Sequence, residues 1–161
     1  MFWEDEGFLL SKFKYSENSV IANFFTSKYG KVSGIIYGAT SKKIKGYLQI
    51  GNLFHLNNFS KNENKISTLK VEIIKAITPA YFSHQKRLCC ITCAMSMVKL
   101  LSAENQANNN IFKLIKNFFY FLNNDAWLKN YILWELKLLK EAGYDLNLKN
   151  ISIKEVENNK T

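Results

Sequence analysis

The stretch Ser67-Thr-Leu-Lys-Val-Glu-Ile-Ile74, which is followed by Pro79, divides the chain into two parts with different periodicities. In this stretch apolar and polar residues alternate, which predicts a half-buried β-strand. Pro79 cannot lie inside a central strand, and it restricts Thr78 to an extended conformation. Beyond it, apolar residues recur every three or four positions, which predicts helices. We therefore expect an α+β fold with domains at residues 1–79 and 80–161.

Four stretches before Ser67 are also typical of short strands. They are rich in β-branched and aromatic residues, and turn signals such as Tyr29-Gly30-Lys31 or the polar loop at residues 60–65 separate them. These stretches are Phe8–Phe13, Val20–Thr26, Val32–Tyr37 and Leu53–Phe59. Five strands within about 75 residues suit a small closed barrel such as an OB-fold, because closure leaves no strand edge open to aggregation.

Three helices are expected after Pro79, forming a helical bundle domain. Apolar residues at helical spacing predict them at Phe82–Leu101, Ile111–Leu122 and Ala126–Ala142. Asp125 is a candidate N-cap for the third helix, and Gly143 is expected to end it. The polar residues 147–161 are expected to be loosely held.

The third expected helix carries the widest apolar stripe. Trp127, Tyr131 and Trp134 recur along one face, with further Leu and Ile residues beside them. A stripe this wide is more typical of the centre of a bundle than of a ligand site. Glu135 lies within the stripe, and it is either exposed at the rim or paired with Lys137 or a barrel residue.

The formal net charge of the chain is +9. A basic surface attracts polyanions, and nucleic acid is the commonest polyanion in a cytosol. The composition offers a second explanation, because 21 Lys stand beside a single Arg and there are 19 Asn. That bias is typical of a genome rich in A and T. Charge alone favours nucleic acid only slightly, so the arrangement of the lysines has to decide.

One part of the predicted barrel, from Lys28 to Lys45, contains lysines and tyrosines but no acidic residue. Lysine neutralises phosphate, and aromatic rings stack on unpaired bases with about 1–3 kcal/mol per base. This part is a candidate platform for single-stranded nucleic acid. The alternative is that the lysines are solvated loop charges and the tyrosines belong to the core. The candidate residues are Lys28, Tyr29, Lys31, Tyr37, Lys42, Lys43 and Lys45.

No catalytic motif stands out in the sequence. Gly30, Gly34 and Gly38 are spaced by four residues and are predicted to lie on a strand, so they do not form a phosphate-binding loop. No Gly-x-Ser-x-Gly motif is present, and neither His lies near a candidate nucleophile. We therefore do not expect an enzyme.

The cysteines and the N-terminal acids are the residues that could bind a metal. Cys90-x-x-Cys93 has the spacing of half a zinc site, but no second pair of Cys or His follows it. Together with Cys89 these residues lie in a helical pattern, where thiols pack as small hydrophobic groups. The acids at residues 4–6 could hold a cation, but we expect solvated charges on a frayed N-terminus. No metal and no cofactor are expected.

No apolar run approaches the length needed to cross a membrane, and the N-terminus is acidic where a signal peptide would be basic. We therefore expect a cytoplasmic protein without a membrane segment.

Several short motifs, taken in order, resemble the RecO family of recombination mediators. They are Trp3–Ser11, Tyr15–Glu17, the strand to Thr26, Tyr29–Gly34, Gly38, Ser41, Leu48–Leu53 and, near the end, Tyr131–Tyr144 with its Gly-aromatic pair. Each motif alone is weak, but the ordered set covers most of residues 2–148. The resemblance implies an N-terminal OB-fold followed by a helical domain, which agrees with the periodicities.

The resemblance also implies a function. Members of this family bind single- and double-stranded DNA, anneal complementary strands and help to load the RecA recombinase at gaps, without nucleotide hydrolysis. They act with a RecR partner and bind the acidic tail of single-strand-binding protein, so the protein is expected at the nucleoid. Two alternatives remain: an adaptor for that tail with little DNA affinity, and a shortened relative that binds DNA weakly.

This sequence departs from the family pattern at its end. Family members usually extend well beyond the Gly-aromatic pair, some with a four-Cys zinc module, whereas no Cys follows Leu148 here. Zinc is therefore not expected.

An acidic, apolar tail needs an apolar pocket with cations at its rim. The predicted helices provide both, and Arg87 is the only residue in the chain that can hold a carboxylate through two parallel hydrogen bonds. The alternative is a local structural role for Arg87. The candidate partner-binding residues are Lys86, Arg87, Lys99, Lys113 and Lys116.

Overall fold

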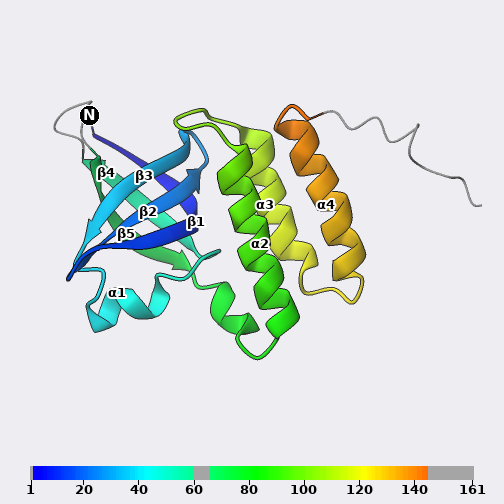
Figure 1. The fold of residues 1–161 in the computed structure, drawn as a ribbon, viewed down its shortest axis with the longest axis horizontal. Helices are drawn as coiled ribbons and strands as arrows, with labels where there is room; N and C mark the ends of the chain where they lie inside the picture. The colour runs from blue at the N-terminus through cyan, green and yellow to red at the C-terminus, as the bar shows by residue number, and fades with distance from the viewer. Residues whose placement is uncertain (1, 60–65, 145–161) are drawn as a thin grey trace, which may run out of the picture.

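A computed structural model of the protein describes residues 2–59 and 66–144. A five-stranded β-barrel lies beside three helices, of which α4 is farthest from the barrel (Figure 1). The expected architecture of an OB-type barrel followed by helices is therefore confirmed. None of the described helices is long and apolar enough to cross a membrane.

The barrel closes in the strand order β1-β2-β3-β5-β4. Its strands are β1 (Phe2–Ser16), β2 (Ser19–Thr26), β3 (Gly30–Tyr37), β4 (Leu53–Phe59) and β5 (Ser67–Lys75). Neighbouring strands are antiparallel except β3 and β5, which run parallel and pair only at Gly34 with Ser67 and at Ile35 with Thr68. The pairing of β3 with β5, which closes the barrel, is therefore much shorter than the pairings between the other strands.

Alternation along the strands fills the barrel interior. Leu9, Phe24, Phe54, Leu56 and Leu69 are fully or almost fully buried in one cluster. Successive residues of a strand point to opposite faces, so the period-two pattern of the sequence becomes an inner apolar face. The prediction of strands from that pattern is confirmed for all five.

Strand β1 is much longer than the predicted Phe8–Phe13, and the expectation of a frayed N-terminus is wrong. Asp5 is buried in β1, and its carboxylate accepts hydrogen bonds from the Ser27 hydroxyl, the Lys28 amide at 2.7 Å and the Glu6 amide at 2.8 Å. A buried carboxylate is tolerated when donors surround it. Asp5 therefore anchors the turn between β2 and β3.

Between β3 and β4 the chain forms a short helix that the sequence pattern did not predict, α1 (Lys42–Tyr47). The hydroxyl of Ser41 accepts a hydrogen bond from the Ile44 amide and caps its first turn. Ile44 and Tyr47 pack against the barrel core, so α1 covers one end of the barrel. Six residues are too few to display a helical period in the sequence.

A 3-10 turn, η1 (Thr78–Tyr81), links the barrel to the helices α2 (Gln85–Leu101), α3 (Asn109–Phe121) and α4 (Trp127–Glu141). Pro79 lies at the start of η1, where its missing N–H group costs nothing.

Helix α2 begins three residues later than predicted, and α3 begins two residues earlier because Asn108 caps it. Asp125 does not cap α4; the N-cap is Ala126, without a side-chain hydrogen bond. Gly143 follows α4 with φ +91°, as expected for a glycine that ends a helix.

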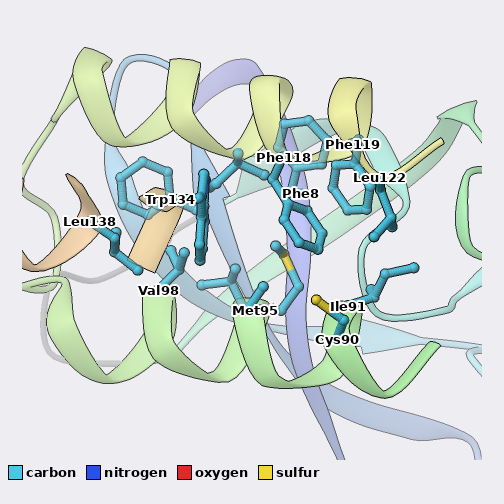
Figure 2. Close-up of a cluster of buried hydrophobic side chains, with 14 of the residues drawn as sticks. Phe8, Cys90, Ile91, Met95, Val98, Phe118, Phe119, Leu122, Trp134 and Leu138 are labelled. Carbon is cyan, nitrogen blue, oxygen red and sulfur yellow. The ribbon is translucent and has the colours of Figure 1, made fainter. Parts of the chain in front are cut away.

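The core of the helical part includes residues from the barrel. Phe8 of β1 lies between α2 and α3, and its ring centroid is 5.5 Å from those of Phe112 and Phe119 (Figure 2). Leu10 and Phe25 belong to the same cluster. The barrel thus contributes one wall of the helical core.

The prediction that the third helix lies at the centre of the bundle is wrong. Helix α4 lies at the edge and buries only Trp134 and Leu138, while Leu128, Ile132 and Leu133 are exposed. The Trp134 indole N–H donates to the Leu114 carbonyl at 2.8 Å and fixes α4 on α3. Glu135 is half-buried beside α2 and, among the described residues, makes no ion pair.

Candidate nucleic-acid interface

The lysines and tyrosines predicted as one platform lie at two opposite ends of β3. Lys28, Tyr29 and Lys31 are in or next to the β2–β3 turn, whereas Tyr37 is the last residue of the strand. Eight strand residues span roughly 25 Å. The predicted set therefore divides into two groups, and its role in binding stays a prediction.

The group at the β2–β3 turn is engaged in structure. The ring of Tyr29 stacks on Trp3 with centroids 4.3 Å apart, and both rings pack against the barrel core. The Lys31 ammonium, which is largely buried, donates to the Lys99 carbonyl at 3.0 Å and lies 3.3 Å from the Glu104 carboxylate. Lys31 therefore joins the barrel to the end of α2.

At the other end of the barrel, some of the predicted side chains are exposed. Tyr37 exposes 61% of its surface, and Lys42 and Lys45 are exposed on α1 close by. Of Lys43 only its place in α1 is described. A groove of about 610 Å³ opens here between β3, α1 and β5, with Tyr37 and Tyr47 on its wall. It lies where β3 and β5 diverge beyond their short parallel pairing.

Two further aromatic residues lie on the same side of the sheet as Tyr37. Phe13 and Tyr15 of β1 each expose 55% of their surface. Phe13 is paired with Ile21 of β2, which is paired with Ile35 of β3, so these three residues form a row across the strands. Tyr15 lies in the bulge next to the Ser16–Ser19 pair, and Ser19 is paired with Tyr37. The rings thus line the outer face of β1–β2–β3, where the Lys99 ammonium of α2 lies 4.5 Å from the Phe13 ring centroid.

Polar side chains form the next row of this face. The Asn23 amide donates to the Ser11 hydroxyl at 2.8 Å, and the Ser33 hydroxyl donates to the Asn23 carbonyl oxygen at 2.5 Å. This network fixes three neighbouring strands beside the row of Phe13, Ile21 and Ile35. The outer face of strands 2 and 3 is where OB-folds bind oligonucleotides.

Positive charge accumulates at the α1 end of the barrel, where the Lys12 ammonium lies on the opposite face of β1 from Phe13 and donates a hydrogen bond to the Leu48 carbonyl. Burial lowers the pKa of Lys12, and the nearby charge of Lys45 lowers it further. Repulsion between these ammonium groups makes the site favourable for an anion. We call Phe13, Tyr15, Tyr37, Lys42 and Lys45 the barrel platform.

Only part of this set was predicted from the sequence. Phe13 stands at the end of a predicted strand and Tyr15 outside it, because the polar residues around them break the alternation. A bulge between Leu9 and Ser11 shifts the phase of β1 and brings these rings onto the outer face. A phase shift of this kind has no clear signal in a single sequence.

The residues predicted to bind a partner are also dispersed. Lys86 and Arg87 line a groove of about 590 Å³ at the start of α2, where the Arg87 guanidinium lies 5.9 Å from the Trp127 ring centroid. Lys99 lies over Phe13, and Lys116 is 2.8 Å from the Glu6 carboxylate. Lys113 lines the seam between α3 and α4. Only Lys86 and Arg87 thus belong to one site, and their partner stays a prediction.

The expectation that all three cysteines pack inside is wrong, because Cys90 is buried while Cys89 and Cys93 are exposed. Burial raises the pKa of the Cys90 thiol to about 12. Within residues 2–59 and 66–144, no three His, Cys, Asp or Glu side chains form a group that could hold a metal ion.

Comparison with known families bears on this arrangement of barrel and helices. The family model described as "Recombination protein O N terminal" matches residues 1–77, and the one described as "Recombination protein O C terminal" matches residues 83–158. The chain belongs to the RecO family. The two matches meet between β5 and α2, and together they cover nearly the whole sequence.

Individual relatives agree with this family assignment. The chain is 30% identical over 154 residues to the DNA repair protein RecO of Rickettsia canadensis and 29% identical over 153 residues to that of Rickettsia felis. It is 27% identical over 153 residues to the DNA repair protein RecO of Cereibacter sphaeroides. These alignments cover 95–96% of this chain but only 64% of each relative. The chain therefore spans about two thirds of the length of the relatives it matches.

Proposed function

We propose that the protein binds single-stranded DNA on the barrel platform and acts in DNA repair by homologous recombination. The observation that carries the proposal is the group of exposed rings, Phe13, Tyr15 and Tyr37, near the lysines of α1 on the outer face of an OB-type barrel. Rings stack on unpaired bases and ammonium groups pair with phosphates, so the platform favours single strands. The family membership supports the assignment to repair.

The mechanism we propose is non-covalent. Lysines of the platform screen the repulsion between phosphates, and the rings hold bases unpaired and accessible, so a complementary strand can pair with them. In this proposal the protein also binds duplex DNA through its backbone charge. It acts at the nucleoid with a RecR-type partner in loading RecA, as the family resemblance implies.

Anisotropy of a labelled oligothymidylate tests the barrel platform. Tyr37→Ala is expected to weaken binding about tenfold, which corresponds to one base that no longer stacks. Lys42→Glu with Lys45→Glu is expected to weaken binding further and to flatten the salt dependence by about 0.7 for each phosphate that is no longer neutralised. Lys31 is left unchanged, because its bonds at the domain junction are structural.

Matched controls lie on the helical part. Tyr144 and Lys129 are exposed and remote from the barrel, so Tyr144→Ala and Lys129→Glu should leave binding unchanged. Equal affinities for the platform variants and for these controls would refute the platform.

A second candidate function is capture of the acidic tail of single-strand-binding protein. The groove at the start of α2 favours it, because Lys86, Arg87 and the ring of Trp127 line it together with Ser83, His84 and Gln85, without any acidic residue among the described lining. In calorimetry with a synthetic tail peptide we expect micromolar affinity that Arg87→Ala weakens. Lys99→Ala is the control, because Lys99 lies at the other end of α2 against Phe13. No heat at low salt with the intact protein would exclude this adaptor role.

A further inference from the structure

The seam between α3 and α4 forms a second groove, on a different face from the barrel platform, in which polar side chains border the apolar Leu114, Phe121, Leu133 and Trp134. One stripe of side chains from each helix lines it. The stripe of α3 contains Asn110, Lys113, Asn117 and Tyr120, and that of α4 contains Asn130, Leu133, Lys137, Lys140 and Glu141. Two hollows of about 480 and 240 Å³ follow one another along the seam and share Asn117 and Lys137. They therefore form one continuous groove.

Positive charge gathers at one end of this groove. Lys113 of α3 lies opposite Lys137 and Lys140 of α4, because the two helices run antiparallel. The one acidic residue among the described lining is Glu141, whose carboxylate accepts a hydrogen bond from the Asn110 amide at 3.0 Å. No ion pair involves the three lysines within the described part of the chain. Their charge is thus available to an anion.

The other end of the groove is aromatic. Tyr120 exposes 76% of its surface and lies two helical turns along α3 from Lys113. Asn117, Asn124 and Asn130 line the hollow beside it. Each asparagine amide offers both a donor and an acceptor, which suits the edges of nucleotide bases.

The lysine end of this groove faces away from the barrel. Phe112 and Phe119 pack against Phe8 of β1, and Lys113 and Tyr120 each follow one of them by a single residue. One residue corresponds to a rotation of about 100° around a helix. Lys113 therefore lies on a face of α3 that the barrel does not cover, whereas Tyr120 also lines a hollow between α3 and the barrel, together with Phe8 and Lys75.

We propose that the α3–α4 seam is a second binding site for single-stranded nucleic acid, with phosphates at Lys113, Lys137 and Lys140 and a base stacked on Tyr120. The proposal rests on the proposed function, because a protein that brings two strands together needs a place for each. An acidic peptide is the less suitable occupant, since it needs an enclosed apolar pocket for its anchor side chain, whereas this groove is open and asparagines stand beside its apolar residues.

Energy transfer between two oligothymidylates tests the seam, because these strands cannot pair with each other. One strand carries a donor and the other an acceptor, and sedimentation of the full chain verifies that one protein molecule holds both. We expect transfer with the wild-type protein. Lys113→Glu with Lys137→Glu and Lys140→Glu should leave the first strand bound within about twofold and weaken the second at least tenfold, and Tyr120→Ala should weaken the second about tenfold.

Lys129→Glu and Tyr144→Ala are the matched controls, since both residues are exposed and line neither hollow. Equal second-strand affinity in the seam variants and the controls would overturn the proposal. So would displacement of the second strand by an acidic apolar peptide, which would identify the seam as a peptide site. If the wild-type protein binds one strand tightly but not a second, this inference alone is overturned. If it binds no strand at low salt, the proposed function is refuted as well.

Discussion

Gly30 lies where the backbone of the barrel closely approaches that of the helical part. It begins β3 with φ +67°, and a Cβ atom built on it would lie 1.8 Å from the Gln106 carbonyl oxygen. Its neighbour Lys31 bonds to the end of α2 and to Glu104. The backbone of the helical part can pack on β3 here only because position 30 carries no side chain.

Gly30→Ala is therefore expected to destabilise the protein strongly. Gly38→Ala is the matched control, because Gly38 has φ +68° but open space around it. Both variants carry the strain of positive φ, about 1–2 kcal/mol. Gly30→Ala should lose a further 1–3 kcal/mol or so from overpacking against Gln106. Urea unfolding measures the difference. Equal midpoints would show that Gln106 can move away from the added methyl group without a loss of stability.

Cys90 makes the stability of the protein depend on alkaline pH. Burial raises the pKa of its thiol from an ordinary value of 9.0 to about 12. Above pH 9 the unfolded chain releases this proton while the native protein keeps it, so unfolding becomes more favourable as the pH rises toward 12. The loss of stability approaches about 1.4 kcal/mol per pH unit.

Urea unfolding at about pH 8 and pH 10.5 tests this dependence. The wild-type protein should lose more stability between the two values than Cys90→Ala does, and the difference between them isolates Cys90 from other titrating groups. Identical losses would show that the thiol is not protected by burial.

At the scale of elements, β1 connects the two cores. Alternation along β1 lets Leu9 fill the barrel while Phe8 and Leu10 pack in the helical core. Phe8→Ala should therefore destabilise the whole protein by about 3–5 kcal/mol. Phe2→Ala is the control in the same strand, because Phe2 is 63% exposed and Phe8 only 2%. Thermal melts followed by circular dichroism measure both, and a Phe8 variant as stable as the Phe2 variant would contradict the shared core.

The sequence predicted the type and order of the elements well. Alternation in Ser67–Ile74 and the helical spacing after Pro79 are signals that each element carries by itself. Residues whose environment depends on another element could not be placed. The position of α4 at the edge, the burial of Asp5 and the two separate groups of lysines all depend on which faces the folded chain brings together. For that reason the sequence indicated only Tyr37, Lys42 and Lys45 of the platform that we propose.

At the scale of the whole molecule, the barrel and the helices should unfold together. Phe8, Leu10 and Phe25 of the barrel belong to the same core cluster as α2, α3 and α4, so neither part keeps its buried surface without the other. We expect one calorimetric transition whose van't Hoff and calorimetric enthalpies agree. Two transitions, or a barrel that melts separately by near-ultraviolet circular dichroism, would contradict a shared core.

We expect the barrel to open first at the short parallel pairing between β3 and β5. Other strand neighbours are hydrogen-bonded along most of their length, whereas β3 and β5 meet only around Gly34–Ile35 and Ser67–Thr68. Amide protons of β3 and β5 next to this pairing should exchange with deuterium through local openings that leave β1 and β2 paired. The barrel then behaves as a rolled sheet with a slit along one side, and the slit runs beside the groove that holds Tyr37 and Tyr47.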